Sequence, residues 1–248
     1  MVCVDQYDEK YLEWITREKL ARVGLETPAI NSLIGNISGK KVLCLGSGSG
    51  DECAYIKSLG AKEVIGIDIS ELFVETSKKK YPELNFQVMD LERLDFKDSS
   101  FDFVFSKLAM YYLESWTQAL SEVKRVLKKK GTFLFSTHNP VYWAGEKTEN
   151  DEQTTRIMGY EKNKKTGEAR IYGDYLNPRK ITDFRSKNFK IEYWHRPFSM
   201  LIQDIVNSGL KIVSCLEPKP DELAKIEDLH FLEKTNRLPM FLIFKLEK

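Results

Sequence analysis

The fold of this chain is decided by residues 42–50, which read Val42-Leu43-Cys44-Leu45-Gly46-Ser47-Gly48-Ser49-Gly50. The first four residues are apolar with no polar alternation, which is typical of a central parallel strand covered on both faces. Glycines then alternate with serines, and Asp51-Glu52 begins a helix. A strand that ends in a glycine turn and opens a helix lets a ligand approach bare backbone. The stretch therefore predicts the first strand of an open α/β sheet, with a ligand site at its carboxyl end.

Downstream of this stretch, strands and helices alternate at the spacing of βαβ units. Further strands are predicted at residues 63–67, 85–89, 101–105 and 132–136, and helices at 51–59, 70–80 and 116–127. The run Lys128-Lys129-Lys130-Gly131 is interpreted as the turn before the fifth strand. This alternation indicates a doubly wound, mostly parallel sheet with right-handed crossovers.

The two ends of the chain extend this core. Helical periodicity covers residues 5–37, with a break at Gly24 and a second short helix at 29–34 that Pro28 opens. The C-terminal part is predicted to hold a helix at 196–208 capped by Gly209, a strand at 210–216 and a last strand at 239–244. We expect these two strands to pair antiparallel, and no helix is predicted between them.

Residues 138–195 interrupt the alternation with a polar segment that is rich in aromatic side chains. These are Tyr142, Trp143, Tyr160, Tyr172, Tyr175, Tyr193 and Trp194. Because a structureless loop of this length is rare in a compact domain, we interpret the segment as an insertion or lid with a few antiparallel strands. Its rings suit a lid over a flat or apolar ligand, a cage for a cation, or the insertion's own small core. The predicted single domain (1–248) thus comprises an N-terminal helical cap (1–39), a ligand-binding core (40–137), this insertion (138–195) and a C-terminal completion of the sheet (196–248).

The composition excludes several classes of function. With 38 basic and 37 acidic residues the net charge is +1, so no overall attraction to nucleic acid or an anionic membrane is expected. Four cysteines without a C-x-x-C pair and three histidines predict neither a metal site nor a disulfide framework. The N-terminus becomes acidic from Asp5 and has no apolar region of a signal peptide, and no apolar run approaches the roughly 20 residues that span a bilayer, so we expect a cytoplasmic protein.

Two acids follow the second and third strands. Asp68 ends the second strand, where a carboxylate is placed to accept both hydroxyls of a ribose. The alternative is that it caps the following helix, but Ser70 competes for that position. Asp90-Leu91 ends the third strand, where a carboxylate can accept the adenine N6 hydrogens while the aliphatic side chain covers the ring. The alternative for Asp90 is a loop acid that caps a turn.

The glycine spacing distinguishes two kinds of nucleotide ligand. The dinucleotide fingerprint G-x-G-x-x-G needs its third glycine at Asp51, whereas the chain has it one residue earlier, at Gly50. An acid at the start of the helix repels a pyrophosphate. A positively charged nucleoside is favoured by nearby acids, so the sequence favours such a ligand over NAD.

These motifs resemble the class I S-adenosylmethionine-dependent methyltransferases, in particular their small-molecule branch. The resemblance rests on residues 42–50, 64–69, 88–91, 101–106 and 126–133, and on the C-terminal helix with Gly209, the 217–220 stretch and the last strand. It implies a Rossmann-like, seven-stranded sheet whose last strand is antiparallel, and S-adenosyl-L-methionine as the cofactor. It also implies a cofactor site formed by Gly46, Ser47, Gly48, Gly50, Asp68, Ile69, Asp90, Leu91, Ser106 and Leu108. Among these, the glycines would face the methionine and ribose, Ile69 the adenine, and Ser106 and Leu108 the methyl group.

The chain departs from the family in its first motif. The family usually has an acid where this chain has Cys44, and that acid braces the glycine loop through hydrogen bonds. A thiol accepts hydrogen bonds poorly, so either another group braces the loop or cofactor affinity is lower.

Methyl transfer from a sulfonium is an in-line displacement that needs positioning more than a specific catalytic group. A base is required only if the acceptor carries a proton, and the candidates are His138, Tyr111 and His195, with Tyr112 beside them. Each has a structural alternative. His138 is then a loop histidine bonded to backbone, and His195 is a residue at a helix start. Tyr111 and Tyr112 are then aromatic residues of the core. The stretch Asn139-Pro140-Val141-Tyr142 is similar to a signature of adenine and glutamine methylating enzymes, but it follows the wrong strand.

The sequence thus predicts methyl transfer to a small-molecule acceptor, with no nucleic-acid or membrane partner and no metal. Two alternatives stay open: a module that binds S-adenosylmethionine or S-adenosylhomocysteine without methyl transfer, and an NAD-dependent oxidoreductase. The presence of Cys44 in place of the family's acid favours the module without methyl transfer. The glycine spacing argues against the oxidoreductase.

Overall fold

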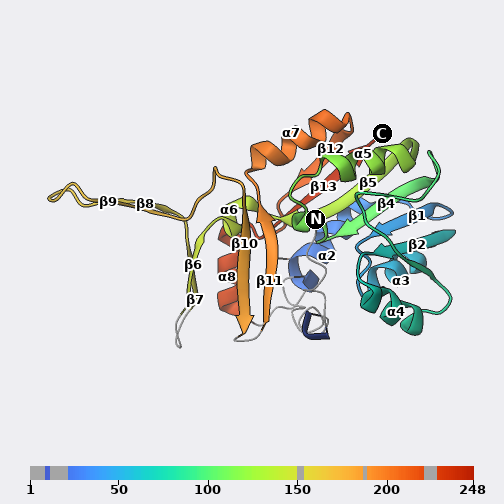
Figure 1. Cartoon of the computed structure of the whole chain (residues 1–248), viewed down its shortest axis with the longest axis horizontal. Helices are drawn as coiled ribbons and strands as arrows, with labels where there is room; N and C mark the ends of the chain where they lie inside the picture. Colours follow the sequence, from blue (N-terminus) through green and yellow to red (C-terminus); the bar gives the residue numbers. More distant parts are fainter. Residues whose placement is uncertain (1–8, 12–21, 150–153, 187–188, 221–227) are drawn as a thin grey trace.

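A seven-stranded sheet forms the centre of the computed structural model, which describes residues 9–11, 22–149, 154–186, 189–220 and 228–248 (Figure 1). The strand order is β12-β13-β5-β4-β1-β2-β3. The strands are β1 (Lys41–Leu45), β2 (Glu63–Asp68), β3 (Asn85–Val88), β4 (Phe101–Lys107), β5 (Leu127–His138), β12 (Lys211–Leu216) and β13 (Phe241–Glu247). Strands β1 to β5 are parallel, and β13 is antiparallel to both β5 and β12. The predicted Rossmann-like sheet with an antiparallel last strand is confirmed.

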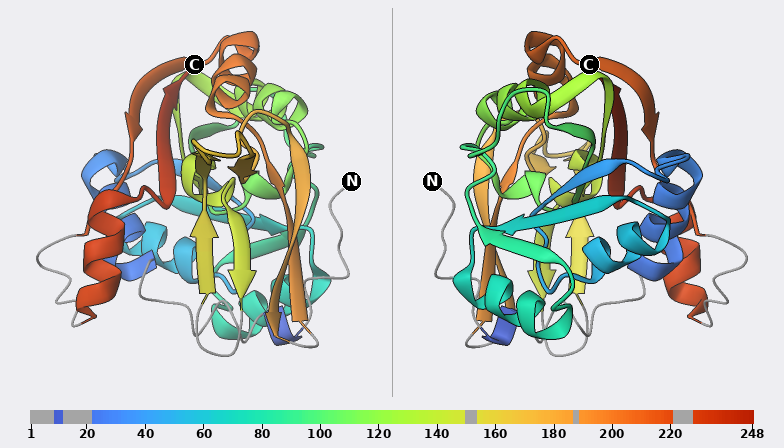
Figure 2. Two further views of the ribbon diagram at one scale, coloured as in Figure 1. Left: turned by 90° about the vertical axis from the view of Figure 1, so that its left-hand side faces the viewer. Right: turned by 90° about the vertical axis from the view of Figure 1, so that its right-hand side faces the viewer.

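Helices cover both faces of the sheet (Figure 2). One buried cluster joins the sheet to α2 (Thr27–Ile34), α3 (Asp51–Ser58) and α4 (Glu71–Lys80), and a second joins it to α5 (Thr117–Val126) and α7 (Phe198–Ser208). The sequence of helix α5 explains why it packs on the sheet. Its apolar residues recur at three- and four-residue steps and are buried, as at Leu120, Val123 and Val126. Because each face is covered, the open surface of the sheet is its edge at the strand ends.

The predicted helix ends are confirmed where a cap is encoded. Ser70 is the N-cap of α4, and its Oγ accepts a hydrogen bond from Phe73 N at 3.4 Å. Gly209 ends α7 in the left-handed region, with φ of 68°. No helix in the described part of the chain is long and apolar enough to cross a membrane.

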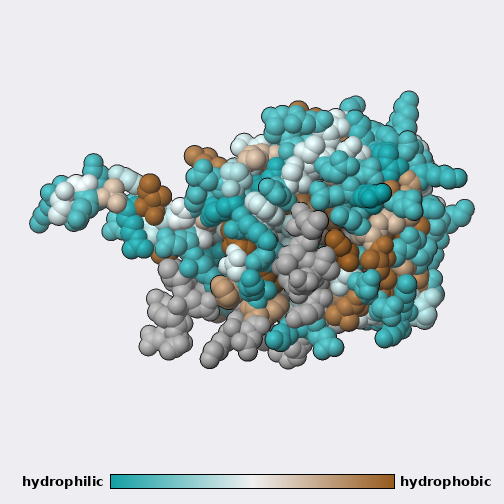
Figure 3. Space-filling view, viewed as in Figure 1, coloured by the Kyte–Doolittle hydropathy of each residue, from teal (hydrophilic) through white to brown (hydrophobic). Residues whose placement is uncertain are grey.

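The insertion after β5 begins with α6 (Pro140–Trp143) and continues as three separate two-stranded antiparallel sheets. These are β6 (Glu146–Glu149) with β7 (Thr154–Ile157), β8 (Gly159–Lys162) with β9 (Ala169–Tyr172), and β10 (Arg179–Ser186) with β11 (Phe189–His195). The β8–β9 hairpin projects far from the body (Figure 1), and its surface is mostly hydrophilic (Figure 3). The β10–β11 ribbon instead lies against the body, where Ile191 and Tyr193 are buried.

Three local predictions are wrong. The Lys128–Gly131 run is not a turn but lies inside β5, with Lys130 at a φ of 63° as an irregularity. Lys130 N donates to Lys248 O, and Lys248 N donates to Gly131 O, so residue 248 extends the hydrogen-bond ladder of the sheet at this point.

Helix α8 (Leu229–Arg237) lies between β12 and β13, where no helix was predicted. Gly24 does not break the helical pattern but lies in a π-helical turn, η2 (Arg22–Glu26), that leads into α2, while most of the predicted helix upstream lies outside the described residues.

Candidate functional site

The loop after β1 is held in a conformation that glycine alone adopts readily. Gly46, Gly48 and Gly50 have φ values of 64°, 51° and 85°. A Cβ atom built at Gly46 would lie 2.5 Å from Cβ of Ala109, so the loop and the segment after β4 are in direct contact. A Cβ at Gly48 would meet nothing within 4 Å. Gly48 is therefore the point of the loop where bare backbone faces open space.

Three hydrogen bonds from neighbouring elements fix this loop. Ser47 N donates to Ile67 O at 2.8 Å, Gly48 N donates to Asp68 Oδ2 at 2.9 Å, and Ser77 Oγ donates to Gly48 O at 2.7 Å. The accepting residues Ile67 and Asp68 belong to β2, and the donating residue Ser77 belongs to α4. The bracing that the family obtains from an acid at position 44 is thus supplied by Asp68 and Ser77.

Cys44 takes no part in this bracing. Its thiol is buried at the boundary of β1 and α3, where a hydrogen bond with Cys53, together with burial, raises the pKa of Cys44 well above its usual range. The thiol is consequently neutral and behaves as a small apolar side chain. The cysteine that replaces the family's acid is therefore part of the apolar core and not of the hydrogen bonds that hold the glycine loop.

Asp68 is buried at the end of β2, with 8% of the residue exposed. Its Oδ1 accepts from Ser70 N at 3.0 Å, so Asp68 also supports the start of α4 although Ser70 provides the side-chain cap. Burial raises the pKa of the Asp68 carboxyl, against the hydrogen bonds from Ser70, Gly48 and Ile69, which lower it. Gly48 N donates to Oδ2 and Ser70 N donates to Oδ1, and the two oxygens together keep lone-pair capacity for a ligand.

The other sequence-predicted cofactor residues lie along the same edge of the sheet. Asp90 is exposed, and its Oδ1 accepts from Glu92 N at 2.9 Å, so it shapes the turn after β3. Ile69 and Leu91 are half-buried beside Asp68 and Asp90. Ser106 is buried, and its Oγ donates to Leu45 O at 3.2 Å, which ties the end of β4 to the end of β1.

Leu108 follows β4 in a strained conformation, with φ of 51°. Its backbone N donates to Ser136 Oγ at 3.0 Å, and Ser136 Oγ donates to the carboxylate of Glu26. Leu108 also packs against a cluster of buried aromatic side chains. The strained residue therefore joins the strand ends that carry the glycine loop and Asp68 to an aromatic region.

Glu26 and Lys107 are residues of this edge that sequence reasoning missed. Glu26 is fully buried, and Lys107 Nζ lies 3.8 Å from Glu26 Oε2 and 3.4 Å from Glu52 Oε1. The sequence signal was weak, because Glu26 lies in a helical segment where a charge usually faces solvent. The pair adds fixed charges to the strand ends.

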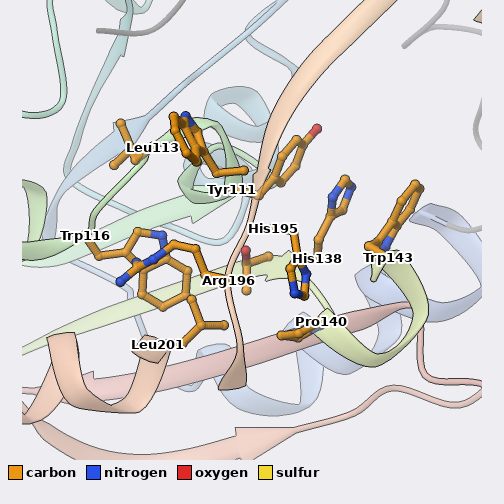
Figure 4. Close-up of a pocket in the computed structure, with 11 residues that line it drawn as sticks. Tyr111, Leu113, Trp116, His138, Pro140, Trp143, His195, Arg196 and Leu201 are labelled. Atoms are coloured by element: carbon orange, nitrogen blue, oxygen red, sulfur yellow. The ribbon is translucent and has the colours of Figure 1, made fainter. Parts of the chain in front are cut away.

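The catalytic candidates meet at one small cavity at the end of β5 (Figure 4). Its empty volume of about 300 Å³ includes solvent at the mouth. It is lined by Tyr111, Leu113, Trp116, Thr137, His138, Pro140, Trp143, Trp194, His195, Arg196 and Leu201. Three of these rings form a stack: His138 lies 3.7 Å from Tyr111 and 3.9 Å from Trp143 between ring centroids. Tyr111 Oη donates to Tyr112 Oη at 2.8 Å, so both tyrosines also belong to the aromatic core.

His195 ends β11 rather than starting α7. Its Nε2 lies 2.8 Å from the carbonyl oxygen of Tyr175, which accepts a hydrogen bond from Nε2–H. Nδ1 is buried and has no hydrogen-bond partner among the described residues. Burial lowers the pKa of His195, so the ring is neutral at pH 7 and Nδ1 carries a lone pair.

The aromatic side chains of the insertion lie in different environments. Trp143 and Tyr193 are buried in the aromatic cluster, and Trp194 lines the cavity. Tyr160, on the projecting hairpin, is 65% exposed. The stretch 139–142 starts α6: Asn139 is its N-cap, with Oδ1 accepting from Val141 N at 3.0 Å. No group of three or more His, Cys, Asp or Glu side chains suited to a metal ion occurs in the described part of the chain.

Comparison with known proteins is consistent with this geometry. Residues 43–135 match the family model described as a methyltransferase domain. A solved structure of a putative S-adenosylmethionine-dependent methyltransferase from Listeria monocytogenes is similar, with a TM-score of 0.73 and 27% identity over 90% of this chain and 96% of that chain.

Two curated relatives are similar to different extents. An uncharacterized protein from Haemophilus influenzae is 28% identical over 88% of this chain and 85% of its own length. A demethylmenaquinone methyltransferase from Chlorobaculum parvum is 32% identical over 37% of this chain and 38% of its own length. The glycine loop, the sheet topology and these similarities agree, and they identify residues 43–135 as a methyltransferase domain of the S-adenosylmethionine-dependent type.

Proposed function

We propose that the protein transfers the methyl group of S-adenosylmethionine to a small molecule bound in the aromatic cavity. The observation that carries this proposal is the position of the cavity. Tyr111 and His138 line it at the ends of β4 and β5, and Ala109, two residues before Tyr111, touches Gly46 of the glycine loop. In open α/β sheets ligands bind at the carboxyl ends of the strands, so acceptor and cofactor share one edge.

The walls of the cavity and the charge of the chain support a small acceptor. The cavity is small and is walled mainly by aromatic rings, as small-molecule sites commonly are. A net charge of +1 provides no general attraction for nucleic acid. The relative from Chlorobaculum parvum, whose name gives demethylmenaquinone as acceptor, also supports a small organic substrate.

The proposed cofactor site is the edge formed by β1, β2, β3 and β4. Asp68 accepts the ribose hydroxyls, and Gly46, Ser47, Gly48 and Gly50 face the methionine and ribose. Asp90 accepts from the adenine amino group, and Ile69 and Leu91 cover the adenine ring. Leu108 lies toward the methyl group, and Ser106 holds the end of β4 in place. The acids match the positive charge of the sulfonium compound.

If the methyl acceptor carries a proton at the attacking atom, His195 is the proposed general base that removes it. The carbonyl of Tyr175 fixes the proton on Nε2, which leaves Nδ1 as the basic nitrogen. As the acceptor oxygen or nitrogen attacks the methyl carbon, the bond from carbon to sulfur breaks and the proton moves to Nδ1. His138 and Tyr111 then serve as the wall that orients the acceptor.

The test is a transfer assay with S-adenosylmethionine labelled in its methyl group and a panel of phenols, carboxylic acids, amines and quinols. Label in at least one small product supports the proposal, and His195→Asn should then reduce kcat more than KM, whereas His138→Asn should mainly raise KM. Label found only in protein or nucleic acid would contradict it. Tight binding of S-adenosylhomocysteine with no labelled product from the panel would also count against it.

A further inference from the structure

Arg196 is a buried arginine in the wall of the cavity. It follows the last residue of β11, and 5% of the residue is exposed. Its Nη2 donates to Asp204 Oδ2 at 2.7 Å, and the guanidinium lies over the ring of Trp116, 5.7 Å from the centroid. Nε and Nη1 are buried and meet no acceptor among the residues that the structure describes.

This arrangement is energetically incomplete. Arginine keeps its charge at all relevant pH values and carries five N–H donors. A buried donor without an acceptor destabilises the folded protein, and more so when the group is charged. The two nitrogens therefore call for acceptor atoms that the described chain does not supply.

Asp204 contacts Arg196 through one oxygen only and leaves these two nitrogens without a partner among the described residues. Its Oδ2 accepts from Trp116 N at 2.8 Å and from Ser115 Oγ at 3.4 Å as well as from Arg196. The carboxylate is thus held at the start of α5 by three donors. The remaining donors of Arg196 are left for a different partner.

The surroundings define the chemistry of that partner. Among the described residues that line the cavity, Arg196 alone carries a permanent charge. Trp116 and Leu201 lie beside it, while His138 and Trp143 stack at the other side of the cavity (Figure 4). A ligand that reaches from one side to the other needs a flat apolar body and an oxygen-bearing group at the Arg196 end.

We infer that Arg196 binds a carboxylate of the methyl acceptor, so that the acceptor is a small aromatic or apolar carboxylic acid. This inference rests on the proposed function, because it assigns the chemistry of the acceptor in the same cavity. A carboxylate offers two charged oxygens with several lone pairs to the free donors. Since Asp204 already compensates one unit of charge, a singly charged carboxylate fits better than a phosphate, which carries about two.

Binding of matched probes tests this inference. The probes are benzoate, phenylacetate and 3-phenylpropanoate, each paired with its neutral amide, titrated with and without S-adenosylhomocysteine. Tryptophan fluorescence is a suitable signal, because Trp116, Trp143 and Trp194 line the cavity. At least one carboxylate should bind about tenfold more tightly than its amide, the ratio that about 1.4 kcal/mol produces.

Variants assign the preference to Arg196. Replacing Arg196 alone leaves the charge of Asp204 buried, so the informative variant is Arg196→Met with Asp204→Asn, which removes both charges. It should lose the preference for the carboxylate while binding the amide and S-adenosylhomocysteine within about twofold of the parent. Arg170→Gln is the matched control, because the Arg170 side chain is 62% exposed on the projecting hairpin.

The outcomes separate this inference from the proposed function. Equal affinity for every carboxylate and its amide, no binding of any probe, or a preference that survives in the double variant would overturn the carboxylate site. Failure of the parent protein to bind S-adenosylhomocysteine would instead overturn the proposed cofactor site. The titrations without S-adenosylhomocysteine still decide the question of Arg196 in that case.

Discussion

The cofactor edge of the sheet and the insertion at residues 138–195 are built in opposite ways. Around the glycine loop, short crossovers place Ile67, Asp68 and Ser77 within hydrogen-bond distance of the backbone that they hold. The insertion is three small sheets that do not pair with one another, and its Ile171 is 73% exposed. If the proposed sites are right, cofactor recognition is fixed by the common scaffold, whereas the acceptor side is assembled from an added segment.

The largest effect is expected at the most crowded point of the cofactor edge. Gly46→Ala places a Cβ 2.5 Å from Ala109 at a φ of 64°, so both strain and overlap oppose it. We expect a loss of about 2–4 kcal/mol in unfolding free energy, measured by urea denaturation, and loss of S-adenosylhomocysteine binding. Gly48→Ala is the matched control, because it has the same backbone strain without the overlap and should lose only about 1 kcal/mol. Equal losses in the two variants would show that the contact with Ala109 is unimportant.

Asp68→Ala should weaken S-adenosylhomocysteine binding by about 1.5–3 kcal/mol in calorimetry, because it removes hydrogen bonds to a charged group. Because burial raises the pKa of Asp68 above its ordinary value of 3.8, affinity should fall on acidification at a higher pH than for an exposed carboxyl. Asp68→Asn should flatten that pH dependence. Asp90→Ala offers a comparison, since Asp90 is exposed and its loss should matter less. Unchanged affinity in Asp68→Ala would remove this residue from the site.

A smaller effect is expected from His195, at the boundary of the two regions. Because burial lowers the pKa of His195 below its ordinary 6.5, the unfolded chain takes up a proton at a higher pH than the folded protein. The free energy of unfolding should therefore decrease as pH falls below about 6.5, by about 1.4 kcal/mol for each unit of pKa difference. Chemical denaturation between pH 7.5 and 5 measures this slope. His195→Asn should reduce it, and an unaltered slope would assign it to other groups.

The smallest effect is expected from the projecting hairpin. Replacing residues 159–172 with a short glycine-serine linker removes strands that contact little of the body, so unfolding free energy should change by less than about 0.5 kcal/mol. Binding of S-adenosylhomocysteine should be unchanged. A large loss of either property would show that the hairpin is part of the folded core, and the contrast between the two regions would fail.

Much of the cofactor edge was predictable because its signals are local. Apolar runs that end in Gly46, Asp68 and Ser106 mark strand ends, and the caps at Ser70 and Gly209 mark helix ends. The irregular start of β5 was not predictable, because Lys130 pairs with Lys248 at the far end of the chain. Helix α8 was missed because its segment has few apolar residues, and Thr235 is its one buried residue.

The acceptor side was predictable only as a set of candidates. Tyr111, His138 and His195 were named from their chemistry, but their meeting at one cavity depends on how β11 lies against the sheet end. Glu26 carried only a weak signal and Arg196 none, because their burial depends on partners distant in sequence, Ser136 for Glu26 and Trp116 for Arg196. Side-chain environment of this kind arises from packing, which periodicity does not encode.

The contact between Gly46 and Ala109 has a consequence for how the two substrates influence one another. There is no spare room between these residues, so a displacement of the backbone at one has to be met by a displacement at the other. Ala109 leads directly into Tyr111, whose ring stacks on His138. With the cofactor and the acceptor in the proposed sites, we expect binding of one to alter the affinity for the other, and thermodynamic reciprocity requires the two effects to be equal.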